Sequence, residues 1–399
     1  MIIKNGLLLI NDELVKKDIL IEKGIITKIE DEINGEDVID ASNCFVMEGA
    51  VDVHVHLREP GFTHKETIAT GTLACAKGGI TTALAMPNLK PCPDSLENLK
   101  VEEDIIKKDA LINVYPYGAV SKGQKGEENS SLDDLCKKVY AITDDGFGVN
   151  NIEVLVTAME KAKEYDIVMA SHAEDEVDPY SPQGEYVAVK REIEYAKKVG
   201  VKYHFCHMST KESFEYINNA RSEGYTNITF EVSPHHLLLN KDMIKDSNWK
   251  MNPPLRSEED RLATVKALLE NKDVVIASDH APHSKEEKSR EYNLCPNGIL
   301  GAETMLPLIY TNFIKTGLAT HKDFKNWLVY NPLKIFNLPR KSISVGSEAD
   351  LVVLDINNYR EYKEEEIVSI GKNSPYIGMK LTGFPIYTIL KDKIIWRAK

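Results

Sequence analysis

The sequence has no excess of basic residues and no long hydrophobic segment. Its 399 residues carry 49 Lys and Arg against 62 Asp and Glu, a net charge of −13 at pH 7. This acidity argues against a general nucleic-acid binder, which needs a basic face. No stretch approaches the roughly 18 apolar residues of a membrane helix, and the first residues do not resemble a secretory signal. We therefore expect a cytoplasmic protein that binds neither nucleic acid nor membranes.

Paired cysteines are also missing. The six cysteines are scattered singly, without a CxxC pair. In a cytoplasmic protein such cysteines are expected to be reduced core or loop residues rather than disulfides or a zinc cage. The chain is 42% hydrophobic and 28% charged, which is the composition of a globular protein with a substantial core.

Both ends of the chain are rich in β-forming residues. The first part contains "MIIKNGLLLI" and "ELVKKDILIEKGIITKIE", with Asn5-Gly6 and Lys23-Gly24 as turn signals. The last part contains "SISVGSEADLVVLD" and "GFPIYTILKDKIIWRAK". We expect residues 1–49 and 341–399 to build one small β-sandwich domain together.

The middle of the chain alternates differently. Eight apolar, β-branched runs recur between helix-like stretches: "GAVDVHVHL", "GITTALAMPN", "LINVYPYGAV", "VYAITDDG", "DIVMASHAE", "VKYHFCHMS", "NITFEVSPHH" and "DVVIASDHAPH". Successive strand-then-helix units over about 250 residues are typical of a (β/α)8, or TIM, barrel. The sequence therefore predicts an α/β fold in which residues 50–340 form such a barrel.

Polar residues gather at the C-terminal ends of these runs. They are His54, His56, Asn88, Asp144, Asp145, His172, His207, Asp279 and His283. A single histidine at a strand end is most often a hydrogen-bonded core or surface residue. In a barrel, however, all these strand ends meet at one rim, where catalytic residues lie. The convergence of several such residues therefore favours a functional site.

The residue types indicate a metal site. His54 and His56 are two positions apart, so they face the same side of a strand. Imidazoles suit zinc, and the carboxylates supply anionic oxygen for a pair of metals. Asp144 and Asp145 would face opposite ways, and the pattern leaves the choice between them open.

The other histidines have structural interpretations. His204 precedes His207 by three residues, so we expect it to face the opposite side of its strand, toward the core or a helix. His235 and His236 end the seventh run and are expected near the metals without binding them.

Ordered motifs along the whole chain carry a family resemblance. They are "DVHVHLREPG", "GGITTALAMPN", "TDDG", "SHAED", "CHMSTKES", "SPHHLLL", "MNPPLRS", "SDHAPH" and "NGILGAETMLPL". The chain resembles the amidohydrolase superfamily, and within it the type I dihydroorotases. The resemblance implies an amidohydrolase-type barrel with a β-domain built from both chain ends.

The resemblance also assigns the metal ligands. It implies that His54, His56 and Asp279 hold the more buried metal, and that His172 and His207 hold the second. In many relatives a carboxylated lysine on the fourth strand bridges the metals, but "VYAITDDG" contains no lysine. The chain resembles the bacterial-type subgroup in which the second Asp of "TDDG" takes this place, which selects Asp145. The implied cofactor is Zn²⁺, one or two per chain.

The resemblance further implies the substrate contacts. Arg58 and Asn88 would bind a substrate carboxylate, and Asn252 and His283 would contact the substrate ring. The chain departs from the family pattern at Ser278, where Thr is usual, and at Ala302, where Leu is common. The segment "EDEVDPYSPQGEY" lacks the usual Arg-Pro, which puts its loop contacts in doubt.

The implied reaction is reversible hydrolysis of (S)-dihydroorotate to N-carbamoyl-L-aspartate in pyrimidine (UMP) biosynthesis. A metal-activated hydroxide would attack the ring carbonyl, and Asp279 would act as general acid and base. Aspartate carbamoyltransferase, the preceding enzyme, is a candidate partner. The alternatives are another cyclic amidohydrolase, such as an allantoinase or hydantoinase, and a non-catalytic assembly subunit. The missing lysine and the presence of Arg58 disfavour the first, and the complete ligand set disfavours the second.

Overall fold

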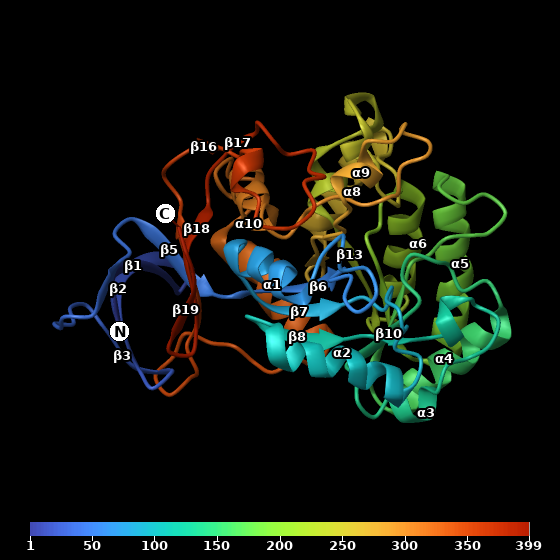
Figure 1. The fold of residues 1–399 in the computed structure, drawn as a ribbon, viewed down its shortest axis with the longest axis horizontal. Helices are drawn as coiled ribbons and strands as arrows, with labels where there is room; N and C mark the ends of the chain where they lie inside the picture. Colours follow the sequence, from blue (N-terminus) through green and yellow to red (C-terminus); the bar gives the residue numbers. More distant parts are fainter. Residues whose placement is uncertain (399) are drawn as a thin grey trace.

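The computed structural model describes residues 1–398, and in it both chain ends share one β-sheet (Figure 1). The strand order is β19-β18-β15-β5-β1-β2-β3, and β4 pairs with β1. The strands are β1 (Ile2–Ile10), β2 (Glu13–Glu22), β3 (Ile25–Glu30), β4 (Val38–Asp40), β5 (Cys44–Glu48), β15 (Asp350–Asp355), β18 (Phe384–Leu390) and β19 (Lys393–Arg397). The antiparallel pairing of β5 with β15 joins the two ends of the chain.

The two predicted turns in the first part of the sheet have different outcomes. Lys23-Gly24 connects β2 to β3, with positive φ at both residues, as expected for a tight hairpin. The turn predicted at Asn5-Gly6 is wrong. These residues lie inside β1, where the pairing register with β2 shifts and Asn5 has a φ of 61°. A β-bulge can use the same left-handed backbone as a tight turn, so an Asn-Gly pair alone does not distinguish a bulge from a turn.

The middle of the chain forms parallel strands. One group runs in the order β6-β7-β8 and the other in the order β14-β13-β12-β11-β10-β9. These strands are β6 (Ala50–Val55), β7 (Ile80–Ala85), β8 (Asn113–Pro116), β9 (Gly118–Ala119), β10 (Ala141–Thr143), β11 (Val168–Ser171), β12 (Lys202–Phe205), β13 (Ile228–Val232) and β14 (Val275–Ile276). A parallel bridge also pairs Val55 with His280, which follows β14. Each of the eight predicted runs contains a strand, and their carboxyl ends share one side.

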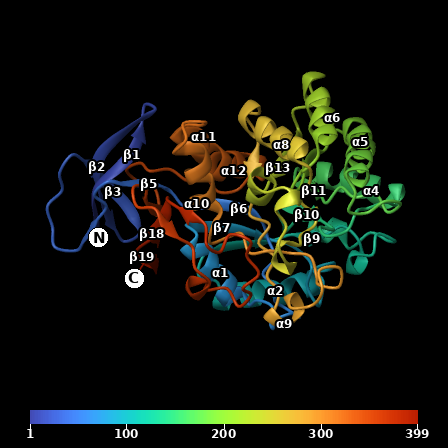
Figure 2. The same ribbon diagram turned by 90° about the horizontal axis from the view of Figure 1, so that it is seen from above.

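Helices follow most of these parallel strands (Figure 2). They are α1 (Ile68–Lys77), α2 (Leu96–Asp109), α3 (Leu132–Leu135), α4 (Ile152–Glu164), α5 (Pro182–Val199), α6 (Lys211–Ser222), α7 (Pro234–Leu238), α8 (Glu258–Glu270), α9 (Lys285–Lys288), α10 (Met305–Ile309), α11 (His321–Lys325) and α12 (Asn331–Ile335). Short 3₁₀ or π segments are η1 (Lys122–Gln124), η2 (Lys241–Met243), η3 (Ser247–Trp249), η4 (Tyr310–Ile314), η5 (Asn326–Tyr330) and η6 (Glu364–Glu366). Local signals fix the ends. Thr67 forms a capping box at α1, and Pro182 and Gly200 bracket α5.

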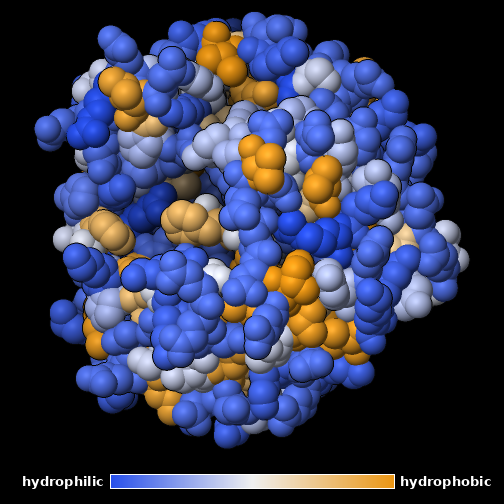
Figure 3. Space-filling view, turned by 90° about the vertical axis from the view of Figure 1, so that its right-hand side faces the viewer, coloured by the Kyte–Doolittle hydropathy of each residue, from blue (hydrophilic) through white to orange (hydrophobic). Residues whose placement is uncertain are grey.

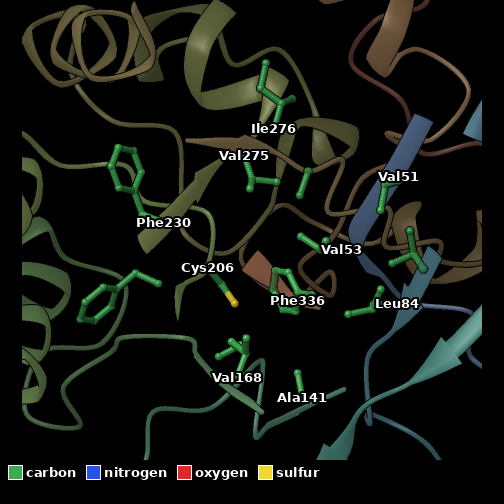
Figure 4. Packing of buried hydrophobic residues seen from close by; sticks show 14 of the residues in the cluster. Val51, Val53, Leu84, Ala141, Val168, Cys206, Phe230, Val275, Ile276 and Phe336 are labelled. Atoms are coloured by element: carbon green, nitrogen blue, oxygen red, sulfur yellow. The ribbon is translucent and has the colours of Figure 1, made fainter. Parts of the chain in front are cut away.

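The main hydrophobic core lies between the parallel strands and their helices. Val53, Cys206 and Phe336 are among its fully or almost fully buried members, and Figure 4 shows them close together in the space between the strands. The surface is different. Figure 3 shows one face of the molecule that is largely hydrophilic with scattered hydrophobic residues, in keeping with the charged composition. All six cysteines are free. Within residues 1–398 no helix is long and apolar enough to cross a membrane.

A C-terminal strap, residues 360–381, leaves the shared sheet. It contains β16 (Arg360–Glu361) and β17 (Lys380–Leu381), which pair with each other. Its buried residues Tyr362, Ile367 and Tyr376 pack with Trp249 and Met251. The strap therefore packs against the part of the chain that contains the parallel strands.

Candidate active site

Six predicted residues meet at the carboxyl ends of the parallel strands. They are His54, His56, Asp145, His172, His207 and Asp279, and all are buried. The Nε2 atoms of His54 and His56 each lie 3.4 Å from Asp279 Oδ1. Nδ1 of His172 lies 3.0 Å from Nε2 of His207. The predicted metal ligands therefore form one compact cluster.

Asp145 occupies the centre of this cluster. Its Oδ2 lies 3.4 Å from His54 Nε2 and 3.5 Å from His56 Nε2. Its Oδ1 lies 3.6 Å from His172 Nδ1 and 3.4 Å from His207 Nε2. Each carboxylate oxygen thus faces one histidine pair, which is the geometry of a bridging ligand.

Asp144 points elsewhere. Its Oδ1 accepts hydrogen bonds from the backbone N–H groups of Val120 (2.8 Å) and Ser121 (3.1 Å), and its Oδ2 accepts one from the Ser121 hydroxyl. Burial raises the pKa of Asp144 to about 6, against the lowering effect of these bonds. Asp144 therefore braces the loop after β9, whereas Asp145 faces the histidines.

Three residues near the cluster have left-handed backbone. The φ values are 61° at Arg58, 34° at His207 and 48° at Asp279. Non-glycine residues rarely adopt such values, and they are concentrated at functional sites because the surrounding structure must hold them there. All three lie just past a strand end, so the chain turns sharply where it presents these side chains.

The cluster attracts positive charge. Burial alone would raise the pKa of Asp145, yet the nearby imidazoles, His54 first and then His172 and His207, lower it well below its usual value. Burial opposes the charged form of His54, yet the surrounding carboxylates raise its pKa well above the usual value. His54 Nε2 and Asp145 Oδ1 are buried without a hydrogen-bond partner. This donor set fits a divalent cation, which would satisfy both atoms.

Glu231 is a cluster residue that the sequence reasoning missed. It lies in β13, is completely buried, and its Oε1 is 2.7 Å from His54 Nδ1. The available signal was a lone carboxylate in the apolar run "NITFEVSP". Buried acidic residues are rare unless paired, so its presence in a buried strand indicates a partner.

His204, His235 and His236 are not among the six residues of the cluster. His204 is in the core, as predicted, but it does not face away from the site: its Nε2 lies 3.2 Å from Glu231 Oε2. His207 follows the end of β12 at Phe205, so strand alternation does not extend to it. His235 and His236 are buried against each other, with ring centroids 4.3 Å apart, and neither lines the cavity described next.

A cavity of about 470 Å³ opens over the cluster. The predicted residues that line it are His56, Arg58, Asn88, Asp145, His172, His207, Asn252 and Asp279. Lys65 and Gln124, which the sequence reasoning did not single out, line it too. His283 does not line the cavity; its Nε2 lies 3.4 Å from Arg58 Nη2 and 2.7 Å from the carbonyl oxygen of Asn297.

Arg58 and Lys65 make one side of the cavity cationic. Arg58 Nε donates to the carbonyl of Pro282 at 3.3 Å, and Lys65 Nζ lies 3.3 Å from His283 Nδ1. Burial, then the charges of Arg58 and Lys65, lower the pKa of His283 to about 2. His283 is therefore neutral at physiological pH.

The amide side chains lie on other parts of the wall. Asn88 Nδ2 donates to the carbonyl of Asp145 at 2.5 Å, and Gln124 Nε2 donates to the same carbonyl at 3.2 Å. Asn252 Nδ2 lies 3.1 Å from His172 Nε2. These contacts connect the cavity wall directly to the cluster residues.

Asn373 fixes one rim of the cavity from the C-terminal strap. Its Nδ2 donates to the carbonyls of Ala281 (3.1 Å) and Gly298 (3.0 Å), and its Oδ1 accepts from the backbone N–H of His283 (3.1 Å). Ala281 and Gly298 both line the cavity. A residue from near the end of the chain therefore holds the loop that follows β14.

Comparisons with known proteins find a matching family model and relatives that span nearly the whole chain. A family model described as dihydro-orotase-like matches residues 44–181. The dihydroorotase of Geobacillus kaustophilus is 41% identical over 420 residues, covering 99% of this chain and 98% of that protein. The dihydroorotase of Staphylococcus aureus is 40% identical over 417 residues, with 98% of each chain covered.

Solved structures with the same fold include an L-hydantoinase (dihydropyrimidinase) from Arthrobacter aurescens. It has a TM-score of 0.87 at 24% identity, over 99% of this chain and 96% of the other. This likeness establishes an α/β fold of the type that hydantoinases have. Full-length identity near 40% to several dihydroorotases establishes the closer relationship. The chain belongs to the dihydroorotase family.

Proposed function

We propose that the cavity performs the reaction of the dihydroorotase family, the reversible hydrolysis of dihydroorotate to N-carbamoyl-L-aspartate. The observation that carries this proposal is the position of Asp145 between two histidine pairs, beneath a cavity that Arg58 also lines. A histidine–carboxylate cluster suits attack on an amide carbonyl, and an arginine beside it suits an anionic ring substrate.

We propose that the cluster holds one or two Zn²⁺ ions. His54, His56 and Asp279 would hold the first, His172 and His207 the second, and Asp145 would contact both. Two buried groups of metal-ligand type support this assignment: His54 with His56 and Asp145, and Asp145 with His172 and His207. When bound, such metals lower the pKa of water toward about 7 and polarise a carbonyl group.

In this mechanism Asp279 moves the proton. Its carboxylate is on the cavity wall, and its Oδ1 is 3.4 Å from both His54 Nε2 and His56 Nε2. Burial would raise the pKa of Asp279, but His54 and the hydrogen bond from His56 lower it far below the usual value, so it is a carboxylate at neutral pH. It can therefore accept a proton from attacking water and deliver it to the leaving ring nitrogen.

Arg58 and Asn88 would bind the substrate carboxylate, and Asn252 would contact the substrate ring. Arg58 is held through Pro282, so the guanidinium is oriented before the substrate arrives. Such orientation lowers the entropic cost of reaching the reactive geometry. Contact of His283 with the ring stays a prediction, because His283 touches Arg58 but does not line the cavity.

We also propose the finer points of organisation. The parallel strands would close into a (β/α)8 barrel, supported by the bridge between Val55 and His280. Residues 1–49 and 341–399 would form a β-sandwich domain around residues 50–340. The protein would act in the cytoplasm, and aspartate carbamoyltransferase is a candidate partner.

The test is turnover by zinc-loaded protein of dihydroorotate, allantoin and dihydrouracil in parallel. We expect dihydroorotate to be hydrolysed at least 100-fold more efficiently than the others, because allantoin and dihydrouracil lack the carboxylate that Arg58 would bind. Each charged hydrogen bond lost in this way costs about 1.5–3 kcal/mol. Preference for dihydrouracil would refute the proposal. Asp279→Asn should lose about 10²–10⁴-fold in turnover without loss of folding.

A further inference from the structure

Glu231 is balanced by imidazoles, whereas three other buried glutamates lie beside an arginine or a lysine. Glu185 lies beside Arg256, Glu303 beside Lys77 and Glu48 beside Lys325. The ion-pair partners of Glu231, within the described residues 1–398, are imidazoles: His54 at 2.7 Å and His204 at 3.2 Å. A buried carboxylate is costly without compensation, so the histidines must be arranged to donate to it.

The contacts of Glu231 specify the protons. A carboxylate only accepts hydrogen bonds, so His54 must donate its Nδ1–H to Oε1. The neutral ring then carries its lone pair on Nε2, the atom that faces Asp145 and Asp279 and has no hydrogen-bond partner. The tautomer imposed by Glu231 is therefore the one that a metal ligand requires.

The same carboxylate also touches the second histidine pair. The backbone N–H of His207 donates to Glu231 Oε1 at 3.2 Å, at a residue whose φ is 34°. A left-handed backbone at a histidine needs external support. Glu231 thus contacts the side chain of His54, which lies in β6, and the backbone of His207, which follows β12.

His204 and Thr229 hold Glu231 in place. His204 Nε2 lies 3.2 Å from Glu231 Oε2, and its Nδ1 lies 2.8 Å from the Thr229 hydroxyl. A carboxylate only accepts hydrogen bonds, so His204 donates its Nε2–H to Glu231 Oε2. Phe336 packs edge-on against the His204 ring, with centroids 5.0 Å apart. Both oxygens of Glu231 are therefore used, and its plane is fixed.

We propose that Glu231 is a positioning residue that sets the metal affinity of the site by fixing the tautomer of His54 and the backbone of His207. This inference rests on the metal site proposed above. It makes His204, which binds no metal itself, part of the same support. Outer partners of metal-binding histidines typically contribute about 10–100-fold in metal affinity.

The test is the zinc affinity of the full chain, measured by competition with a chromophoric chelator. Glu231→Gln keeps the size of the side chain but removes the charge and one acceptor, and should raise the zinc dissociation constants about 10–100-fold. The matched control is Glu102→Gln. Glu102 is almost completely buried too, but its carboxylate makes no hydrogen bond, and burial raises its pKa well above the usual value. The Glu102→Gln protein should therefore bind zinc with an affinity within about twofold of wild type.

His204→Phe provides a second variant that retains an aromatic ring against Phe336. Loss of one donor to Glu231 should weaken zinc binding about fivefold. If Glu231→Gln does not fold, the zinc affinity of His204→Phe tests the positioning role by itself. For variants that bind zinc weakly, saturating zinc should restore most of kcat and leave KM for dihydroorotate unchanged, which a general loss of structure would not do.

The outcomes separate the two proposals. If wild type binds zinc tightly and both Glu231→Gln and His204→Phe bind it equally well, the positioning role is refuted while the proposed function stands. If the variants only lower the unfolding temperature of the metal-free chain, the role is likewise refuted. If wild type binds no zinc, both proposals fall together.

Discussion

Replacing Asp144 and Asp145 one at a time by asparagine should show which of the two binds metal and which only hydrogen-bonds to the loop after β9. Asp145 has a carboxylate oxygen within 3.6 Å of each of four imidazole nitrogens. The amide that replaces this carboxylate in Asp145→Asn would offer one neutral oxygen in place of two anionic ones, and its N–H₂ would face the imidazole lone pairs. Since outer partners alone contribute about 10–100-fold in metal affinity, loss of a direct ligand should exceed that. We expect D145N to lose at least one zinc per chain and most turnover.

Asp144→Asn should cost little. Asp144 Oδ1 accepts both backbone bonds, from Val120 and Ser121, so the asparagine carbonyl can keep them. The Ser121 hydroxyl oxygen already accepts from Gly126 N–H at 2.8 Å and can accept once more from the new amide. We expect a change of about 1 kcal/mol or less in unfolding free energy. With an unfolding entropy of about 2.1 cal/mol/K per residue, this is a shift of about 1 °C in Tm for a 399-residue chain.

The assays are zinc per chain by mass spectrometry after gel filtration, dihydroorotate turnover, and Tm by scanning fluorimetry. D144N should keep wild-type zinc and turnover within a few-fold. Zinc loss in D144N together with retention in D145N would reverse the assignment of the two aspartates and refute the bridging geometry.

The cavity and its rim give three further predictions. Arg58→Met should raise KM for dihydroorotate about 10- to 100-fold with zinc content unchanged, and Arg58→Lys should fall between, because lysine keeps the charge but not the paired donors; an unaltered KM in steady-state kinetics would contradict this. Asn373→Ala removes three buried hydrogen bonds and should lower the unfolding free energy by about 3 kcal/mol, which corresponds to a fall of about 3–4 °C in Tm. The same variant should raise KM without loss of zinc. Zinc loss would show that the strap supports the metals instead. The pKa of His283 is lowered to about 2, so its neutral form persists on lowering the pH until that value is approached. His283→Asn should therefore leave the acid limb of kcat/KM at the wild-type pH, and a moved limb would refute the neutral state.

The sequence determined the order of elements, because hydrophobic patterns and turn residues act locally. All eight apolar runs contain strands, and six of the nine polar residues at their ends form one cluster, since parallel strands bring their carboxyl ends together. Local signals were insufficient where a bulge and a turn share one backbone conformation. Asn5-Gly6 predicted a turn but lies in a strand.

The tertiary structure decided matters that depend on distant contacts. Residue types and spacing alone could not separate Asp144 from Asp145; the structure separates them because loop N–H groups take up one carboxylate and four imidazoles surround the other. Glu231 lies 177 positions from His54, and Asn373 lies 90 positions from His283. No periodicity connects such pairs. The sequence by itself thus determined most of the side chains that meet at the site. Only the fold decided which aspartate joins them and which buried groups orient them, because hydrogen-bond partners are set by packing across strands rather than by order along the chain.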